Sequence, residues 1–382
     1  MVQFQHAFGE SELQRYPSTH DQTLRPFDAA DEGLLSKLQP ALNEQPRPAK
    51  ILLVNDQFGA LTVALATHYD VYHWGDSVIE QKAIELNLAR NQLPKVDLYQ
   101  TQQTLPKDID WVLIKPTKNL AFFAYQLAKL AHAYPTKPIL IGVMQKFITN
   151  NFREITEKYL CDLNPGRGFK KARIISAHLS AESPPQLAEY NYFSVNDGHS
   201  LPEFQVANLP NVFSHTSLDI GARFLLQNFP GHLSPATVAD IGCGNGVLAV
   251  AASLAFPNAT ITAIDESFSA VSAATESFRC NQRENGEFVA SNLFNAVSNR
   301  AFDLILCNPP FHQQRRTTTD TAHKMFKQAA ARLTECGQLW IIANRHLGYP
   351  RPLNKIFHEV NVVAVNQKFV VIQCTQPINK GE

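Results

Sequence analysis

The sequence predicts an α/β protein built from two tandem Rossmann-like units, each with a mostly parallel sheet. Two observations support this prediction. Short apolar strands alternate with helical stretches in both halves of the 382-residue chain. Segments of the first half also recur, in the same order, in the second half. A chain of this length is expected to hold two or three domains.

The repeat is clearest where a short apolar strand runs into a loop and then a helix. The residues that follow Gly59 (Ala-Leu-Thr-Val-Ala) match those that follow Gly246 (Val-Leu-Ala-Val-Ala). Two further correspondences come later in the same order: Asp76 with Asp265, and residues 110–116 with residues 303–309. Three ordered matches indicate a duplicated α/β unit, of which the second copy is the better preserved.

The second half contains seven predicted strands: Val238–Ile241, Thr260–Asp265, Glu287–Ala290, Phe302–Cys307, Leu339–Ala343, Val360–Val365 and Phe369–Cys374. Only three residues separate the last two, so these strands must be antiparallel. We therefore expect a seven-stranded, mostly parallel sheet with an antiparallel hairpin at one edge. The expected domains are residues 1–185 and 211–382, joined by a turn-rich linker over 186–210.

Composition and charge exclude several classes of protein. Hydrophobic residues make up 45% of the chain and charged residues 18%, which is typical of soluble globular proteins rather than fibrous or disordered ones. Lys+Arg and Asp+Glu both number 34, which excludes a globally basic nucleic-acid binder. The six cysteines form no C-x-x-C pair, and the histidines lack metal-ligand spacing, so we expect reduced thiols and no metal. No stretch suits a signal peptide or a membrane helix, and we expect a cytoplasmic protein.

A glycine loop marks the predicted ligand-binding edge of the second unit. Asp240 ends a strand, and Gly242, Gly244 and Gly246 follow in a G-x-G-x-G pattern that opens a helix. Glycines let the backbone approach a ligand closely. A carboxylate at the start of the loop suits an ammonium group and repels a pyrophosphate. The loop therefore predicts S-adenosylmethionine, which carries an ammonium group and no phosphate.

Other residues are predicted to complete this cofactor site. Asp265, at the end of the next strand, is placed to accept hydrogen bonds from both ribose hydroxyls. Asn292, just past the third strand, is expected to contact the adenine edge. Asp219 and Gly221 are expected to wall the methionine end of the cofactor, although a capped docking helix explains these two residues nearly as well.

The motif Asn308-Pro309-Pro310-Phe311 follows a strand and predicts the catalytic site. An exocyclic amine on an aromatic base is a poor nucleophile, because its lone pair is delocalised into the ring. The Asn308 side-chain oxygen and the Pro309 carbonyl would accept its two N–H groups and direct the lone pair at a methyl donor. The two prolines pre-position these acceptors, and Phe311 offers a stacking face for a flipped base.

Basic residues gather in three places despite the balanced total charge. We predict that they contact RNA phosphates: Arg167, Lys170, Lys171, Arg173, Arg315, Arg316 and Arg345.

Together these motifs resemble the ribosomal RNA guanine-N2 methyltransferases of the class I type with duplicated domains. The resemblance is greatest to the large-subunit (23S) methyltransferase G family, with the small-subunit methyltransferase C family a near relative. It covers essentially the whole chain, and its most selective strings are residues 308–314 and 218–223. It implies S-adenosylmethionine-dependent methylation of guanine N2 in 23S rRNA by a protein that we expect to be a monomer. It also implies a degenerate, RNA-binding N-terminal half.

Residue types in the first unit agree with a degenerate copy. Asn55 and Gln57 stand where Gly242 and Gly244 stand in the second unit, and Lys115-Pro-Thr-Lys118 replaces the Asn308 motif. We therefore expect the first unit to bind no cofactor.

The residue patterns leave alternatives open. One is the same chemistry on 16S rRNA, on adenine N6 or on a protein glutamine, since each acceptor is a planar amine. Another is a non-catalytic RNA-binding or assembly factor, which the intact set of site residues argues against.

Overall fold

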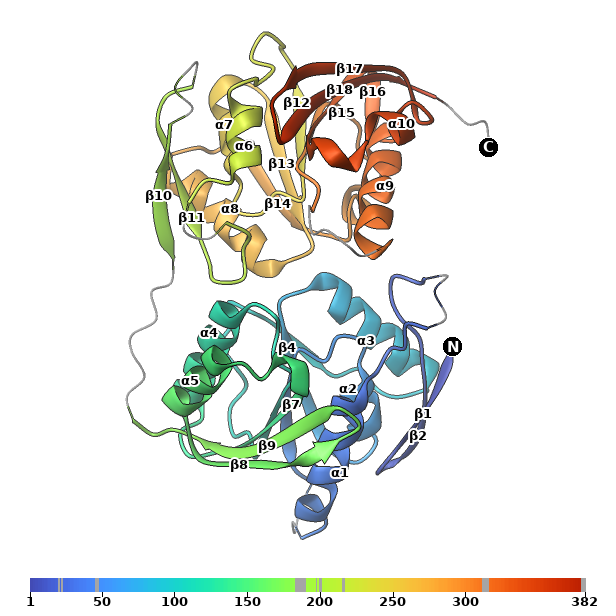
Figure 1. Ribbon diagram of the computed structural model, residues 1–382, viewed down its shortest axis with the longest axis vertical. Helices are drawn as coiled ribbons and strands as arrows, with labels where there is room; N and C mark the ends of the chain where they lie inside the picture. The colour runs from blue at the N-terminus through green and yellow to red at the C-terminus, as the bar shows by residue number, and fades with distance from the viewer. Residues whose placement is uncertain are drawn as a thin grey trace. The chain divides into compact units, whose positions relative to one another are not determined.

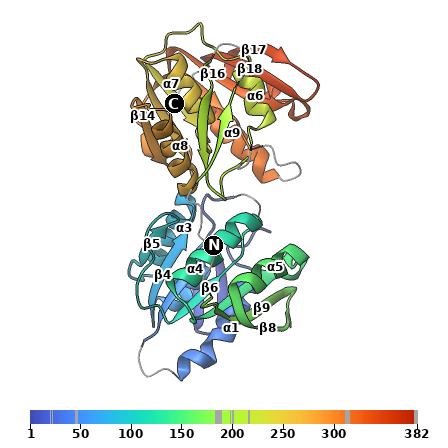
Figure 2. The same ribbon diagram turned by 90° about the vertical axis from the view of Figure 1, so that its left-hand side faces the viewer.

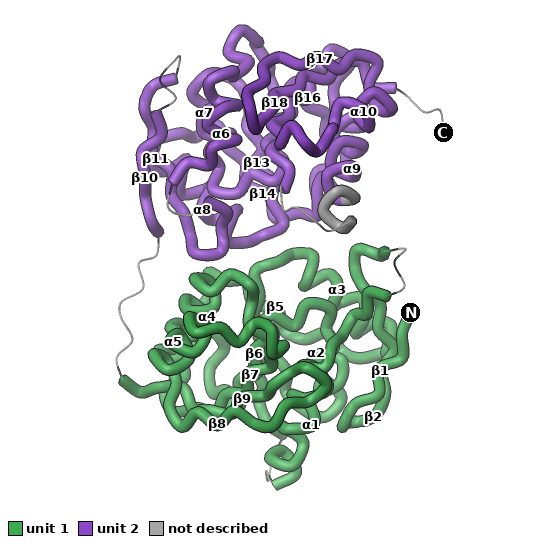
Figure 3. Tube along the Cα trace, in the orientation of Figure 1, with its two compact units in different colours: residues 1–188 green, residues 189–382 purple. Residues whose placement is uncertain are grey.

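The computed structural model describes residues 1–19, 21, 23–44, 48–182, 190–196, 198, 201–214, 217–310 and 316–378, without the side chains of residues 316–320. The chain divides into two compact units, residues 1–188 and 189–382 (Figure 3). This division falls close to the expected end of the first domain at residue 185.

The sheet of the second unit has the strand order β14-β13-β12-β15-β16-β18-β17, in which β18 is antiparallel to both of its neighbours. The prediction of a seven-stranded, mostly parallel sheet with an edge hairpin is confirmed. The strands of this sheet are β12 (Thr237–Ile241), β13 (Thr260–Asp265), β14 (Gly286–Ala290), β15 (Phe302–Cys307), β16 (Leu333–Asn344), β17 (Phe357–Val365) and β18 (Phe369–Pro377). The described helices of the second unit are α6 (Ile220–Leu226), α7 (Val247–Ala255), α8 (Phe268–Cys280), η2 (Asn295–Val297), α9 (Arg316–Ala330), η3 (Arg345–Leu347) and α10 (Pro350–Leu353).

The first unit repeats this arrangement, with the strand order β5-β4-β3-β6-β7-β9-β8. Its strands are β1 (Val2–His6), β2 (Gly9–Leu13), β3 (Lys50–Val54), β4 (Asp70–Gly75), β5 (Asp97–Gln100), β6 (Trp111–Ile114), β7 (Pro138–Met144), β8 (Leu160–Phe169) and β9 (Ala172–Leu179). Its helices are α1 (Ala29–Asn43), α2 (Ala60–Leu65), α3 (Val78–Arg90), α4 (Leu120–Ala133), η1 (Gln145–Phe147) and α5 (Asn150–Tyr159). The same strand order in both sheets agrees with the repeat seen in the sequence.

Helices cover both faces of each sheet and bury two apolar layers. In the second unit, α6, α7 and α8 lie on one face and α9 on the other (Figure 1). In the first unit, α4 and α5 share one face (Figure 2), and α1 and α2 pack on the opposite one. Helix α7 is apolar except for Ser253, and its residues 247–253 are buried, as expected for a helix that is hydrophobic on all sides. Burial on both faces explains why the central strands are continuous runs of apolar residues.

The segment expected as a linker, 186–210, contains a hairpin made of β10 (Asn191–Val195) and β11 (Phe204–Asn208). This hairpin belongs to the second unit, because β11 packs on α8. The Asn281 side chain accepts from the Gln205 N–H at 2.9 Å and donates to the Gln205 carbonyl at 2.6 Å. In the first unit, Asn91 holds the backbone of Glu12 in the β1–β2 hairpin in the same way. The hairpins are therefore part of the repeated unit.

Two further observations bear on the expectations from composition. The six cysteines are free thiols, of which Cys243, Cys307 and Cys374 are buried. Within the described ranges, no helix combines the length and apolar character needed to cross a membrane, and no group of three potential metal-ligating side chains is found.

Candidate active site

The glycine loop connects β12 to α7 at the carboxyl edge of the second sheet. The N–H groups of Gly242 and Cys243 donate to the Ile264 carbonyl at 2.8 and 3.0 Å, which fastens the loop to the end of β13. Gly242, Gly244 and Gly246 all have positive φ angles, between 54° and 78°. Residues other than glycine rarely adopt this backbone conformation.

The atoms around Gly246 and Gly244 indicate that these two glycines have different roles. A Cβ at Gly246 would lie 2.9 Å from the Cα of Ala274 in α8, so this glycine allows α7 and α8 to pack closely. A Cβ at Gly244 would find no atom nearer than the Val212 Cγ1 at 4.0 Å. Gly244 therefore leaves open the side of the loop where a ligand was expected.

Asp240 carries a buried oxygen atom that has no partner among the described residues. Its side chain is 1% exposed, and its Oδ2 accepts from the Ala249 N–H at 3.0 Å, while its Oδ1 is unsatisfied. Burial raises the pKa of Asp240 to about 7, opposed by the Ala249 N–H and assisted by the charge of Asp265. A buried carboxylate without a counter-charge is costly. The site therefore suits a ligand that brings a cation to this oxygen.

Asp265 ends β13, the strand next to Asp240, and its side chain supports the glycine loop. Its Oδ2 accepts from the Gly244 N–H and its Oδ1 from the Ser267 N–H, both at 3.0 Å. Asn292 follows β14 at the same sheet edge, since Ala290 pairs with Asp265. The contacts of Asp265 and Asn292 with a cofactor remain predictions.

Asn308 directly follows β15, the strand on the other side of β12. Its Oδ1 is buried and accepts no hydrogen bond within the described part of the chain. Pro309 is buried and Pro310 exposed, whereas Phe311 lies outside the described residues. A satisfied amide is the rule for buried asparagines, so the unpaired oxygen of Asn308 agrees with the predicted acceptor role.

A third unpaired oxygen was missed in the sequence. Asn344 ends β16 and is 8% exposed, and its buried Oδ1 finds no partner in the described ranges. Side chains alternate along a strand, so Asn344 lies on the same face as Ile342, which packs in the apolar layer under α6 and α7. Asp240 is on this face too, because it bonds to Ala249 of α7. An asparagine at a strand end has no distinctive sequence signature.

Asp219 and Gly221 have evident structural roles. The Asp219 Oδ2 accepts from the Ala222 N–H at 2.9 Å and caps α6. A Cβ at Gly221 would lie 3.2 Å from the Phe369 ring, so this glycine lets α6 dock on the sheet. The structure thus supplies the docking-helix explanation, and a contact of these residues with the cofactor stays a prediction.

The corresponding crevice of the first unit is filled by its own side chains. The Asn55 Nδ2 donates to the Lys115 carbonyl at 2.9 Å and to the Gln126 Oε1 at 3.0 Å. The Lys115 ammonium bonds to the buried Asp31 at 2.7 Å. Burial raises the pKa of Asp31 to about 6 despite this lysine, and the carboxylates raise that of Lys115 against the opposing effect of burial.

The predicted RNA-binding residues differ in their surroundings. Lys170 and Lys171 form the tip of the β8–β9 hairpin with positive φ angles, and Lys170 pairs with Glu32. Arg167 and Arg345 are exposed, and Arg173 is half-buried. Arg315 and the side chain of Arg316 lie outside the described part. These RNA contacts remain predictions.

Both halves of the chain match known protein families. Residues 1–181 match the family described as RLMG N-terminal domain, and residues 203–373 match the Methyltransferase small domain family. The ribosomal RNA large subunit methyltransferase G of Pseudomonas syringae pv. tomato is 38% identical over 96% of this chain and 97% of its own. That of Vibrio parahaemolyticus is 36% identical, over 95% and 94%.

Among solved structures, the T. thermophilus 16S rRNA N2 methyltransferase RsmC, in complex with AdoMet and guanosine, superimposes with a TM-score of 0.77. The match covers 98% of this chain and 97% of that one at 19% sequence identity. The two proteins therefore share a fold over their whole length, including both units.

Proposed function

The chain belongs to the ribosomal RNA large subunit methyltransferase G family, and on this premise we propose that it methylates the exocyclic N2 of one guanine in 23S rRNA. S-adenosylmethionine is the proposed methyl donor. The observation that carries the proposal is the buried Oδ1 of Asn308, which has no described partner, together with the unsatisfied Oδ1 of Asp240 on the neighbouring strand.

The residues around the glycine loop fit this cofactor. Asp240 offers an unpaired carboxylate oxygen to its ammonium group, Gly244 leaves space on the open side of the loop, and Asp265 offers acceptors at the next strand end. When bound, S-adenosylmethionine supplies an electrophilic methyl group on a sulfonium sulfur. The solved structure of the T. thermophilus relative was obtained in complex with AdoMet.

Asn308 and Pro309 then act on the guanine amino group. The Asn308 Oδ1 and the Pro309 carbonyl accept its two N–H groups, which turns the nitrogen lone pair away from the ring plane and toward the methyl group. Pre-aimed acceptors of this kind typically contribute about 3 kcal/mol to catalysis. The methylated amine is acidic, so its extra proton passes to water without a dedicated base.

The third unpaired oxygen favours guanine over adenine. The edge of guanine that carries N2 has three N–H donors, two on N2 and one on N1, whereas N1 of adenine is an acceptor. Asn308, Pro309 and Asn344 offer three oxygen acceptors at the ends of adjacent strands. We assign the N1–H of guanine to the Asn344 Oδ1.

The first unit is proposed to bind RNA without a cofactor. Asn55 bonds to Gln126 and to the Lys115 carbonyl across its crevice, whereas the second unit has a glycine at the position of Asn55. The whole protein is proposed to act as a cytoplasmic monomer. The choice of 23S over 16S rRNA rests on the relatives named for the large subunit.

The test is transfer of a radiolabelled methyl group to separated, deproteinised 23S and 16S rRNA, followed by mass spectrometry of the nucleosides. N2-methylguanosine in 23S rRNA supports the proposal. Label in 16S rRNA, in N6-methyladenosine or in protein glutamine contradicts it. Asn308→Ala is expected to lower kcat by about 100-fold or more, with the affinity for S-adenosylmethionine little changed. A variant with wild-type kcat would remove the role assigned to Asn308.

A further inference from the structure

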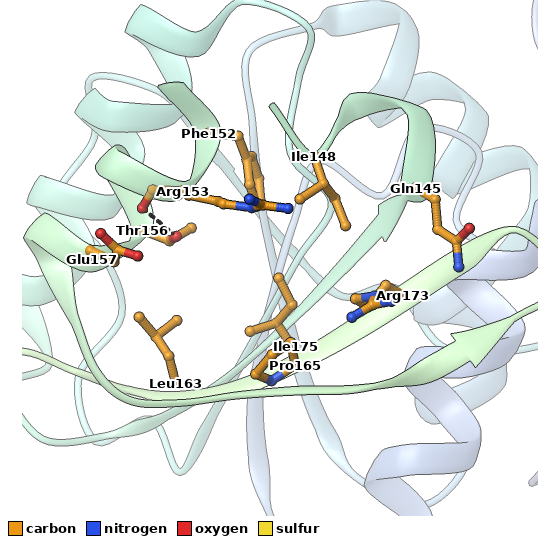
Figure 4. Close-up of a pocket in the computed structure, with 10 residues that line it drawn as sticks. All are labelled: Gln145, Ile148, Phe152, Arg153, Thr156, Glu157, Leu163, Pro165, Arg173 and Ile175. Carbon is orange, nitrogen blue, oxygen red and sulfur yellow. Dashed lines mark hydrogen bonds between the residues drawn. The ribbon is translucent and has the colours of Figure 1, made fainter. Parts of the chain in front are cut away.

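The first unit contains an open cavity of about 420 Å³ between α5 and the β8–β9 hairpin. It lies at the opposite sheet edge from β5, on β8 and β9, and away from the filled crevice at the ends of β3 and β6. Ten residues line it (Figure 4): Gln145, Ile148, Phe152, Arg153, Thr156, Glu157, Leu163, Pro165, Arg173 and Ile175. Its wall, α5, has ten residues, whereas α10, the helix at the corresponding place in the second unit, has four.

Two guanidinium groups reach into this cavity from different elements. Arg153 extends from α5 and Arg173 rises from β9, and their nitrogen atoms face the space between the two walls (Figure 4). Neither side chain forms an ion pair with a described residue, so both cations are available to an anion. Arginine is the side chain best suited to bind phosphate oxygens in pairs.

The remaining lining divides into an apolar floor and an acidic end. Leu163, Pro165 and Ile175 come from the hairpin and form the floor (Figure 4). Glu157 lies at the end of the cavity away from Arg173, and no described cation pairs with its carboxylate (Figure 4). One cavity therefore holds two cations, an apolar floor and a carboxylate that has no described counter-charge.

We propose that this cavity binds one unpaired nucleotide of the ribosomal RNA substrate, an inference that rests on the proposed function. Arg153 and Arg173 hold its phosphate, the apolar floor carries the base, and Glu157 accepts from an amino group on the base edge. Carboxylates recognise such amino groups in base readout. The cavity volume is within the range of about 300–1,000 Å³ that suits small ligands, and single-stranded RNA offers unstacked bases for such pockets.

Its surroundings add cations along the path that the RNA backbone would take. Arg167 is exposed on β8, and Lys171 is exposed at the hairpin tip. The Gln145 N–H donates to the Lys171 carbonyl at 2.8 Å, which fixes the tip against the rim of the cavity. This bond joins the hairpin tip to the rim along which the phosphates would pass.

The first experiment removes both cavity cations in Arg153→Ala/Arg173→Ala and measures the affinity for a deproteinised 23S rRNA fragment across a salt series. The matched control is Lys82→Ala/Lys95→Ala, which removes two exposed cations elsewhere in the first unit. We expect the cavity variant to bind at least about tenfold more weakly. The slope of log K against log salt should fall by about 0.7, because one neutralised phosphate of single-stranded RNA is lost.

The second experiment tests the orientation of the nucleotide with Glu157→Ala. If Glu157 accepts from the base, this variant binds the RNA fragment more weakly with an unchanged salt slope. If Glu157 merely faces phosphate, removing its charge tightens binding, and this result would overturn the assignment. Ultraviolet crosslinking of the wild type to the unmodified RNA fragment should place crosslinks within residues 145–175, and crosslinks confined to other peptides would also overturn it.

These outcomes are separable from the proposed function. If the cavity variant binds RNA like the control while the wild type methylates 23S rRNA, the nucleotide-binding role of the cavity is refuted. The proposed methyltransferase activity is then unaffected. A wild type that methylates no rRNA, but binds it through Arg153 and Arg173, refutes the activity instead. The affinity for S-adenosylmethionine and the melting temperature should be the same in all variants, which excludes unfolding as the cause.

Discussion

The Asn55 side chain donates a 2.9 Å hydrogen bond to the Lys115 carbonyl across the crevice of the first unit. In the repeat, Gly242 and Asn308 occupy the corresponding positions of the second unit, where the glycine has no side chain and the asparagine oxygen is unpaired. The Asn55 side chain thus bridges two strand ends in the first unit, a contact that a glycine at position 242 cannot make. The two units have the same strand order and differ in the side chains at the carboxyl edge of the sheet.

The filled crevice predicts that one chain binds one molecule of S-adenosylmethionine. Isothermal titration calorimetry should give a stoichiometry of one, because Asn55 bridges the crevice of the first unit, whereas the second unit has glycines there and the unsatisfied Asp240 Oδ1. Asp240→Asn should weaken this single binding event and reveal no second one. Two molecules bound per wild-type chain would contradict the closed state of the first unit.

The raised pKa of Asp240 predicts opposite pH effects on stability and on binding. Its folded pKa of about 7 exceeds the ordinary value of 3.8. The carboxyl therefore stabilises the fold at low pH, and this contribution is lost as the pH rises from about 4 to about 7. Relative to Asp240→Asn, the unfolding free energy of the ligand-free wild type should decline across this window in denaturant titrations.

Cofactor binding should follow the ionised form of the same residue. Wild-type affinity for S-adenosylmethionine should rise with pH up to about 7, because the ammonium group pairs with the carboxylate. Asp240→Asn should bind about 30-fold more weakly at pH 8, since a buried charge pair is worth about 2 kcal/mol or more. A pH profile that is identical for both proteins would place the ammonium group elsewhere.

Asn344 is predicted to orient the base without contacting the cofactor. Asn344→Ala should lower kcat/KM for the RNA about tenfold, equivalent to one hydrogen bond of about 1.4 kcal/mol. Asn344→Asp keeps an acceptor oxygen and should recover part of the loss. The affinity for S-adenosylmethionine should not change in either variant. If Ala and Asp substitutions are equally harmful, or both harmless, Asn344 does not accept from the base.

The glycine loop predicts a separation of stability from binding. Gly246→Ala places a Cβ 2.9 Å from the Ala274 backbone, and such overpacking should cost about 1–3 kcal/mol of unfolding free energy. In Gly244→Ala the new Cβ has open space around it. The expected loss of unfolding free energy is therefore about 1 kcal/mol, from the positive φ angle alone. This variant should instead weaken S-adenosylmethionine binding. Denaturant titration and calorimetry on both variants decide, and equal stability losses would contradict the distinction.

The sequence predicted most of the second sheet because its strands are short apolar runs whose burial on two faces leaves a clear pattern. It missed the β10–β11 hairpin, since this hairpin is held by Asn281, which lies more than 70 residues further along the chain. Local propensity in 186–210, with its Pro and Gly turns, gives no sign of that contact.

The site was predicted unevenly for similar reasons. Asp240, the glycines and Asn308 occur in dense local motifs, whereas Asn344 is identified only by the missing partner of its oxygen. Residues 167–173 read as one basic cluster in the sequence. In the structure this cluster is divided, because Lys170 pairs with Glu32 whereas Arg173 lines a cavity together with Arg153. This cavity is formed by the packing of α5 over the β8–β9 hairpin, which the sequence does not reveal.

The most direct test of the account is the distance between guanine N2 and the Asn308 Oδ1 in a crystal structure with guanosine and S-adenosylhomocysteine, the demethylated form of the cofactor. We expect a hydrogen bond of about 2.9 Å, a second one to the Pro309 carbonyl, and the sulfur of the ligand on the far side of N2. A guanine whose amino group faces away while the Asn308 oxygen stays unpaired would contradict the account.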